Sequence, residues 1–174
     1  MKDFKPYLVP VTILIIIDQA VKLLIYNMFM DIRFTFGFLK FHPVQNTNLS
    51  FAGNFIDILS NMWVMVIINI IVIGLLITGY KFYKYKVNHV SNSVKLIVIF
   101  GLAGSICSLI DKLFWGGSLD FIQITGFFTF DFKDCYLTIF EIIFIILGLL
   151  YNRHISISEY LNYWTKKNTG KGIL

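Results

Sequence analysis

The sequence predicts an all-α membrane protein with four transmembrane helices, a small extracytoplasmic β-rich cradle and a short interfacial helix. Three observations support this fold class. The 174 residues are 57% hydrophobic and only 14% charged, whereas a soluble domain of this length needs a polar surface. Apolar windows of about 20 residues, the length that crosses roughly 30 Å of hydrocarbon, occur repeatedly. Between them, two Phe-rich segments show the period-two alternation of β-strands.

The predicted spans are four apolar windows, at residues 7–26, 62–80, 94–113 and 135–151. The first is interpreted as a retained span, because it continues through Asp18 and Lys22 and no small-residue cleavage site follows it. The connections are too short for a second core, so residues 1–174 are expected to form a single integral membrane domain. Its other parts are the outer segments 27–61 and 114–134 and the cytoplasmic tail 152–174.

Lys and Arg residues predict the orientation of the spans, since cytoplasmic loops carry the excess of positive charge. We therefore expect both termini to be cytoplasmic, and the longer, aspartate-containing connections to lie outside. This topology, with attraction to anionic lipid headgroups, accounts for the net charge of +5, so the charge gives no indication of a nucleic-acid partner. The cytoplasmic set is Lys2, Lys5, Lys81, Lys84, Lys86, Arg153, Lys166, Lys167 and Lys171.

The two cysteines and three histidines indicate neither a disulfide nor a metal site. Cys107 and Cys135 fall inside or at the end of predicted spans rather than in an exported loop. His42 is expected outside, whereas His89 and His154 are expected on the cytoplasmic side. Because no His, Cys and carboxylate cluster has metal-ligand spacing, we expect no metal and no other cofactor.

The outer segments contain the Phe-rich stretches that predict the cradle. In residues 33–41, Phe34, Phe36 and Phe38 alternate with smaller or polar residues, and residues 128–133 repeat this pattern. The two stretches are expected to pair as a small sheet on the outer leaflet, with unpaired aromatic loops as the alternative. Two further stretches have helical spacing. They are residues 53–63, expected to form the interfacial helix, and residues 157–164, expected to form a cytoplasmic helix that anchors on the inner surface.

Carboxylates near the membrane edge are candidate functional groups, because a charge there is unfavourable unless it is paired or functional. Asp18 and Lys22 stand four apart on one helix face and are expected to pair. An ion pair that holds helices together and a substrate-facing role both fit this spacing. The same two interpretations apply to Asp111 and Lys112 at the end of the third span, where Lys112 also favours the helix C-terminus.

Asp120 and Asp134 stand on separate elements that the intervening sheet-like turn is expected to bring together. Two close carboxylates at a water-accessible membrane edge do not ionise independently, so one stays an acid while the other serves as a base. An aspartic protease uses this arrangement to activate a water against a peptide carbonyl and then protonate the leaving amine. From spacing alone, a pair of solvated loop acids is the other interpretation.

Five motifs follow one another along the chain. They are Asp18-Gln19 with Lys22, Asn46 followed by Ser50-Phe51-Ala52, Ala103-Gly104 with Ile110-Asp111-Lys112, Gly117-Ser118-Leu119-Asp120-Phe121, and Phe130-Asp131-Phe132-Lys133-Asp134. In their order, spacing and topology they resemble lipoprotein signal peptidase, also called signal peptidase II. The resemblance extends over residues 10–150, and the ordered set is far more specific than any one motif.

The resemblance implies a multi-pass aspartic endopeptidase of the bacterial cytoplasmic membrane, with its active site at the outer leaflet. That family removes the signal peptide of a prolipoprotein by cutting before a diacylglyceryl-modified cysteine. The implied partners are that signal peptide with its lipid-modified cysteine, membrane lipids, and cyclic peptide inhibitors of the family type. Asp120 and Asp134 match the catalytic pair. Positions that match residues shaping the active site and binding substrate are Asp18, Lys22, Asn46, Asp111 and Lys112.

Several positions depart from the family pattern. The motif usually read as Asn-x-x-Asp-Arg has Ser108 and Lys112 in place of the Asn and Arg, and an ammonium cannot make the bidentate contacts of a guanidinium. The motif usually read as Phe-Asn-x-Ala-Asp has Asp131 and Lys133 in place of the Asn and the small residue. An intact aspartate pair among these changes predicts a divergent member with an altered substrate. The other replacements are Gln45 for an Arg and Asn48 for a Gly.

Two other functions fit the sequence less well. A non-catalytic or specialised membrane protein of the same fold would bind lipidated or amphipathic peptides without cutting them. A small transporter or channel subunit is disfavoured, because the spans show no internal repeat and no pair of broken helices. Neutral variants of Asp120 and Asp134 separate the first alternative from a peptidase, since only a peptidase needs both carboxylates for turnover.

Overall fold

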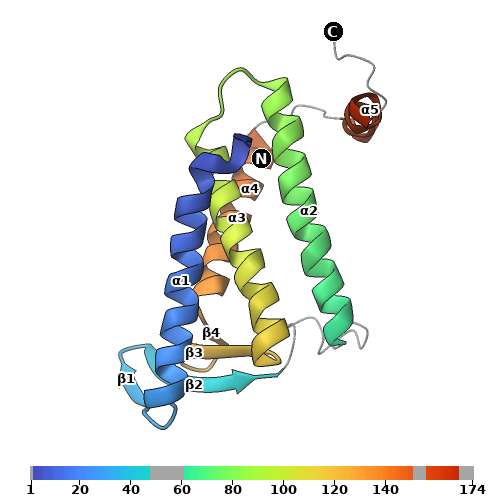
Figure 1. Cartoon of the computed structure of the whole chain (residues 1–174). Helices are drawn as coiled ribbons and strands as arrows, with labels where there is room; N and C mark the ends of the chain where they lie inside the picture. The colour runs from blue at the N-terminus through green and yellow to red at the C-terminus, as the bar shows by residue number, and fades with distance from the viewer. Residues whose placement is uncertain (1, 48–60, 151–155, 169–174) are drawn as a thin grey trace.

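The computed structural model describes residues 2–47, 61–150 and 156–168. The motif Ser50-Phe51-Ala52 lies outside these residues, and so does the predicted interfacial helix apart from its last three positions. Long helices run side by side, and a small sheet packs across one end of them (Figure 1). The start of α1 and the short helix α5 lie at the opposite end.

The helices begin where the chain offers a cap or a proline. A 3-10 turn (Lys2–Phe4) leads into α1 (Lys5–Met28), which has a proline in its first turn. The Asn61 side chain accepts hydrogen bonds from two backbone N–H groups at the start of α2 (Met62–Lys86), and the Ser91 side chain accepts one from the N–H of Val94 at the start of α3 (Asn92–Ile110). After α3 the helix continues as a π-helical turn, η4 (Asp111–Trp115). The remaining helices are α4 (Phe132–Leu150) and α5 (Ile157–Asn168).

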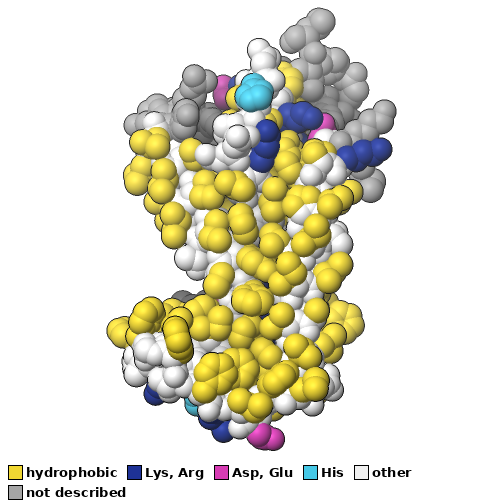
Figure 2. Space-filling model, turned by 90° about the vertical axis from the view of Figure 1, so that its left-hand side faces the viewer, with side chains coloured by type: hydrophobic (Ala, Val, Ile, Leu, Met, Phe, Trp, Pro, Cys, Tyr) yellow, Lys and Arg dark blue, Asp and Glu magenta, His cyan; other side chains and the backbone are white. Residues whose placement is uncertain are grey.

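Three of the described helices are long and apolar enough to cross a membrane: Lys5–Met28, Met62–Lys86 and the continuous helix Asn92–Trp115. They confirm the first three predicted spans, and each extends beyond its apolar window. The fourth window also folds as a helix, α4, which carries Lys133, Asp134 and Glu141 and is not one of these three. Apolar side chains cover the middle of the molecule, and the charged side chains in view gather near its two ends (Figure 2).

Helix α3 is the centre of the bundle, because it packs against α1, α2 and α4. Two glycines let α4 approach it closely. A Cβ at Gly104 would lie 2.8 Å from the Leu137 side chain, and one at Gly101 would lie 2.9 Å from Phe140. Small residues play this part at helix interfaces in membranes, where close backbone approach replaces a hydrophobic driving force.

The sheet is antiparallel, with strand order β1-β2-β3-β4. Its strands are β1 (Phe34–Phe36), β2 (Leu39–Asn46), β3 (Ser118–Ile124) and β4 (Thr129–Phe130). Both predicted Phe-rich stretches therefore join one sheet, and the alternative of unpaired loops is wrong. Two details differ from the prediction. Residues 33–41 form a hairpin that turns at Gly37, which has a positive φ of 61°, and β3 separates the two stretches, which do not pair with each other.

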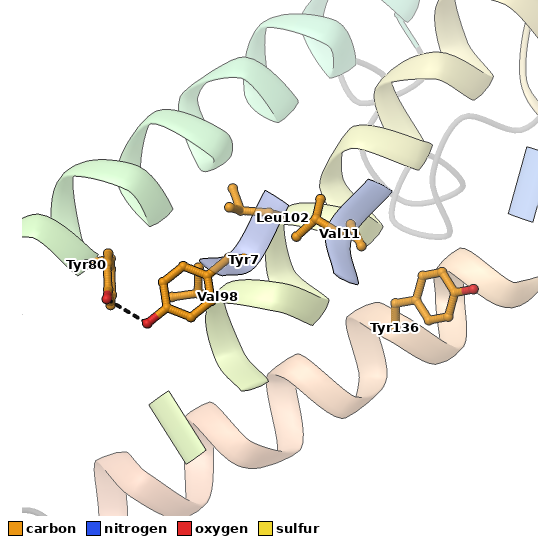
Figure 3. Packing of buried hydrophobic residues seen from close by; sticks show 7 residues of the cluster. Tyr7, Val11, Tyr80, Val98, Leu102 and Tyr136 are labelled. Carbon is orange, nitrogen blue, oxygen red and sulfur yellow. Dashed lines mark hydrogen bonds between the residues drawn. The ribbon is translucent and has the colours of Figure 1, made fainter. Parts of the chain in front are cut away.

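Two groups of buried side chains hold the layers together. One lies among α1, α2, α3 and α4, where the Tyr7 and Tyr80 hydroxyls share a hydrogen bond of 2.7 Å (Figure 3). The other joins Ile25, near the end of α1, to Leu119 and Phe121 of β3. Leu119 and Phe121 point into this second group, and Asp120 is the residue between them in β3. Asp120 therefore lies where the sheet meets the bundle.

Helix α5 confirms the predicted helical stripe after residue 156. Tyr160 of α5 packs edge-on against Phe82 of α2 with ring centroids 5.4 Å apart, and its hydroxyl donates to Oγ1 of Thr78 at 2.7 Å. Docking on α2 therefore fixes α5 in the structure. Its predicted place on the inner membrane surface stays a prediction.

Candidate active site

A cluster of charged side chains lies where α1, η4 and α4 meet β3. All but one of its members are buried, and the carboxylate of Asp134 is the more exposed one, with 41% of its side chain accessible. The buried members are Asp18, Lys22, Asp111, Lys112, Asp120, Asp131 and Lys133. Every residue that the sequence singled out as a candidate, apart from Asn46, thus belongs to this cluster, and Asn46 contacts it from β2.

Lys22 is enclosed by three carboxylates. Its Nζ lies 2.9 Å from Asp18 Oδ2, 2.6 Å from Asp111 Oδ2 and 2.7 Å from Asp131 Oδ2, and all four side chains are 0% exposed. The predicted pairing of Asp18 with Lys22 is confirmed, and it is part of a larger network. Burial without partners would leave each of these charges strongly destabilising, so the network ties α1 to η4 and to the start of α4.

The turn η4 presents Asp111 and Lys112 in different directions. Asp111 accepts a hydrogen bond from Gln19 Nε2 at 3.1 Å, in addition to its ion pair with Lys22, and Ser118 Oγ lies 3.2 Å from its Oδ2. Lys112 instead donates to Oγ of Ser108 at 2.8 Å, one helical turn earlier. Ser108 and Lys112, the two residues that depart from the Asn-x-x-Asp-Arg motif, are therefore hydrogen-bonded to each other.

Asp120 is held at the start of β3 by two neutral donors. Ser118 Oγ donates to its Oδ1 at 2.7 Å, and Asn46 Nδ2 donates to its Oδ2 at 2.8 Å. Asn46 reaches this place because β2 pairs with β3 and because the chain at Gly117 passes very close to it. A Cβ at Gly117 would overlap the Asn46 carbonyl oxygen. This close approach explains why the motif has a glycine, which lacks a Cβ, at this position.

Asp131 and Asp134 form a reciprocal cap at the start of α4. Asp131 Oδ1 accepts from the backbone N–H of Asp134, and Asp134 Oδ2 accepts from the backbone N–H of Asp131, both at 3.1 Å. This is the capping-box arrangement with aspartates in both places. The positive end of the helix dipole also favours a carboxylate in the first turn. The position of Asp134 is thus fixed by backbone groups.

These contacts bring Asp120, Asp131 and Asp134 together, with one oxygen from each lying within 4.8 Å of the others. The predicted approach of Asp120 to Asp134 is confirmed, while their chemical roles stay predictions. A trio of carboxylates also suits a cation. Here the Lys133 Nζ lies 3.7 Å from Asp120, 2.6 Å from Asp131 and 3.6 Å from Asp134, so an ammonium occupies that position.

The electrostatics of Asp131 follow from its two ammonium partners. Burial alone would raise the pKa of Asp131, but Lys133 and Lys22 outweigh it and hold that pKa below its ordinary value. Asp131 is therefore ionised at neutral pH and serves as a fixed anion. Its stabilising contribution is complete above the unfolded-state pKa, near 4, and is lost as the pH falls through the lower folded-state value.

Sequence reasoning noted Asp131 and Lys133 only as departures from a motif and did not place them at the centre of the site. One local signal was present for Asp131, since an aspartate directly before an apolar run, followed by a second acid three residues later, is a helix-start pattern. The sequence did not place Lys133 inside, because apart from the neighbouring Asp131 its partners come from η4, β3 and α4. The candidate Asn48 position and the Ser50-Phe51-Ala52 motif lie outside the described residues.

Comparisons with known proteins bear on the family and the fold of this chain. The sequence model of a protein family described as signal peptidase (SPase) II matches residues 11–150. A bacterial membrane enzyme solved by the in meso method at 2.3 Å resolution has a TM-score of 0.65 and 22% identity, over 87% of this chain and 92% of that chain. A second such structure, at 1.9 Å, has a TM-score of 0.64 and 24% identity, over 85% and 94%. No curated protein sequence matches the chain.

Proposed function

Because the chain belongs to the signal peptidase II family of membrane proteases, we propose that it is an aspartic endopeptidase that cleaves signal peptides from prolipoproteins before the diacylglyceryl-modified cysteine. The observation that carries this proposal is the meeting of Asp120 and Asp134 where the sheet joins the bundle. In the proposed reaction, the ionised carboxylate takes a proton from a water that attacks the peptide carbonyl carbon. The protonated carboxyl group then gives its proton to the leaving amine as the C–N bond breaks.

The proposed topology has four spans in the bacterial cytoplasmic membrane, with α4 as the fourth and both termini cytoplasmic. It is supported by the packing of α4 along α3 and by the charges at the two ends of the bundle. Lys81, Lys84, Lys86 and Lys95 lie on the ends of α2 and α3 opposite the sheet (Figure 1), and this positive charge supports the proposal that that end is cytoplasmic. The proposed active site then faces the outer leaflet, where a lipid-anchored substrate presents its cleavage site.

The proposed roles of the surrounding residues follow from their burial. Asp134 is the more exposed member of the pair and is proposed to face the attacking water. Asp18, Lys22 and Asp111 are 0% exposed. We propose that Lys22 holds Asp131 and that Asp18 and Asp111 fix Lys22, so that these residues shape the site rather than touch the substrate. Asn46 is proposed to orient Asp120. The proposed contact of Lys112 with substrate stays a prediction from the family motif.

The decisive test uses the purified full chain in lipid with a diacylglyceryl-modified prolipoprotein peptide, and mass spectrometry of the products. We expect a single cut immediately before the modified cysteine, and we expect the unmodified peptide to be the poorer substrate. Binding without any cut would favour the alternative, a non-catalytic protein of this fold that captures lipidated or amphipathic peptides. One observation favours that alternative, namely the ammonium of Lys133 beside both members of the pair.

The exposed aromatic residues of the β1 hairpin are expected to bind the lipid-proximal part of the substrate. Phe34, Phe36 and Phe38 are 58%, 81% and 72% exposed. Replacing all three with Ser should weaken substrate capture about a hundredfold or more, because burying each Phe contributes roughly 1.5–3 kcal/mol. The rate at saturating substrate should change little, since Asp120 and Asp134 are held by other elements.

Kinetics over a range of substrate concentrations measure the two effects of the hairpin variant separately. Phe144→Ser, at an exposed aromatic residue far along α4, is the matched control and should affect neither quantity strongly. A large fall in the saturated rate with unchanged capture would contradict substrate binding and would make the hairpin a device that positions the scissile bond.

Metal chelators are expected to leave cleavage unchanged. In the proposed reaction a carboxylate activates the water, and the position among Asp120, Asp131 and Asp134 that suits a cation is taken by the Lys133 ammonium. The measurement is the cleavage rate after prolonged dialysis against a chelator, with a zinc peptidase treated in parallel to show that the chelator works. Loss of activity that added zinc restores would contradict the expectation.

A further inference from the structure

Lys133 lies in the first turn of α4, yet its ammonium stands at the centre of the carboxylate cluster. Its Nζ is 2.6 Å from Asp131 Oδ2 and 3.3 Å from Asp111 Oδ2. It is also 3.7 Å from Asp120 Oδ1 and 3.6 Å from Asp134 Oδ1. With only 7% of its side chain exposed, Lys133 is a buried cation within ion-pair distance of both members of the proposed catalytic pair.

Two anchors keep the ammonium in this place. Lys133 Nζ donates to Asp131 Oδ2 and to Ser118 Oγ, both at 2.6 Å. Asp131 is itself fixed, because it caps α4 and pairs with Lys22. Ser118 in turn donates to Asp120 Oδ1 at 2.7 Å. The ammonium is therefore held by groups that also hold the pair, and it does not depend on solvent for its position.

Asp131 and Lys133 form a matched unit. They are the two departures from the Phe-Asn-x-Ala-Asp motif, and they bring one negative and one positive charge that bond to each other. The net charge of the cluster is the same with both as with neither. A lysine alone would add an uncompensated cation, so the pairing indicates that the ammonium is accommodated as a part of the site.

The other buried lysines around the pair have partners elsewhere. Lys22 contacts Asp18, Asp111 and Asp131, and Lys112 contacts Ser108. Among the described residues, Lys133 is thus the cation that forms ion pairs with both Asp120 and Asp134. The groups that face this region are Asp18 and Lys22 from α1, Cys107, Asp111 and Lys112 from α3 and η4, Asp120 from β3, Asp131 before α4, and Lys133, Asp134, Cys135 and Tyr136 from α4; β2 contributes the neutral amide of Asn46.

We propose that Lys133 is a positioning residue that supplies the counter-charge between Asp120 and Asp134, and that it thereby moves the working range of the site to lower pH. The inference rests on the proposed function, because it takes these two carboxylates as the catalytic pair. Turnover requires one of them protonated and the other ionised. A neighbouring ammonium favours the ionised form of both, so the pair carries its single proton at lower pH than it would without Lys133.

The test compares pH profiles of the cleavage rate at saturating substrate for the full chain in lipid. Lys133→Gln should move both limbs of the profile to higher pH by at least about one pH unit, because a close positive charge is removed from each carboxylate. Lys133→Arg keeps the charge and should keep the position of the wild-type profile. A merely structural role would lower the rate at every pH without moving the limbs, and that result would overturn the inference.

A second readout does not depend on cleavage. Infrared difference spectra report protonated carboxyl groups during a pH titration, and Lys133→Gln should move that titration upward while Lys133→Arg should not. If neither the wild type nor the variants cleave the substrate, but Lys133→Gln still shifts the infrared titration to higher pH, the proposed function is wrong and the counter-charge role of Lys133 is supported. If the chain cleaves the substrate, but Lys133→Gln shifts neither the pH profile of cleavage nor the infrared titration, the inference about Lys133 is overturned and the proposed function is not. Should Lys133→Gln fail to fold, Lys133→Met removes the same charge with a side chain of similar length.

Discussion

Replacing either Asp120 or Asp134 by Asn is expected to lower the cleavage rate at saturating substrate by about a thousandfold or more. Asn has the size of Asp but neither carries a negative charge nor exchanges a proton in the reaction. At position 120 the amide keeps one of the two acceptor oxygens and can donate from its NH2 group to Ser118 Oγ in place of the other contact. At position 134 the amide oxygen still accepts from the backbone N–H of Asp131, so the start of α4 remains capped.

Substrate affinity separates this effect from a loss of structure. Both variants should bind the diacylglyceryl-modified peptide about as well as the wild type, and the double variant should lose little more activity than either single one, because the two groups act as a unit. Asp31→Asn, at an exposed aspartate after α1, is the matched control and should keep its activity. A rate within about tenfold of wild type for Asp120→Asn or Asp134→Asn would remove the aspartic mechanism.

The membrane part of the fold could be predicted because its signal is local. An apolar window long enough to cross hydrocarbon has few other stable structures, and the described residues of all four windows are helical. Their ends were less predictable. The third helix extends through the π-helical turn to Trp115, two residues past its window. Asp111 is stabilised there by a distant partner, Lys22, and Lys112 by Ser108 one helical turn earlier, rather than by local hydrophobicity.

The sheet was predicted only in part, because alternation shows that a segment is extended but not which segment lies beside it. The Phe pattern identified both outer stretches as strands. It did not reveal β3, whose buried Leu119 and Phe121 flank a buried aspartate and so give a mixed pattern. The turn at Gly37 was also hidden, since the alternating phenylalanines continue across it.

In the candidate site, too, contacts between residues close in sequence could be predicted, and contacts between distant segments could not. Asp18 and Lys22 are one helical turn apart, so their pairing followed from sequence spacing. A lysine near the end of a membrane helix usually extends towards the interface, which is the expectation for Lys133. It is buried instead because Asp131, Ser118 and the two proposed catalytic carboxylates meet at that point, and their meeting depends on the whole fold.

Lys22→Met is expected to lower the free energy of unfolding by about 3–5 kcal/mol, the usual result when one partner of a buried ion pair is removed. The ammonium contacts three carboxylates, and all four side chains are 0% exposed, so the variant would leave buried carboxylates without their counter-charge. The measurement is chemical or thermal unfolding of the chain in detergent. The deficit should shrink at low pH, because protonation of the carboxylates removes the unpaired negative charge.

Lys84→Met provides the matched control for burial. Lys84 Nζ lies 2.6 Å from Asp3 Oδ1, the same distance as Lys22 from Asp111, but these two side chains are 44% and 43% exposed. Solvent screens such a pair, so its removal should change stability very little. In the double variant Asp18→Asn/Lys22→Met, part of the lost stability should return, since one unpaired carboxylate is also removed. If Lys22→Met and Lys84→Met have the same free energy of unfolding, the buried network does not hold α1 to η4.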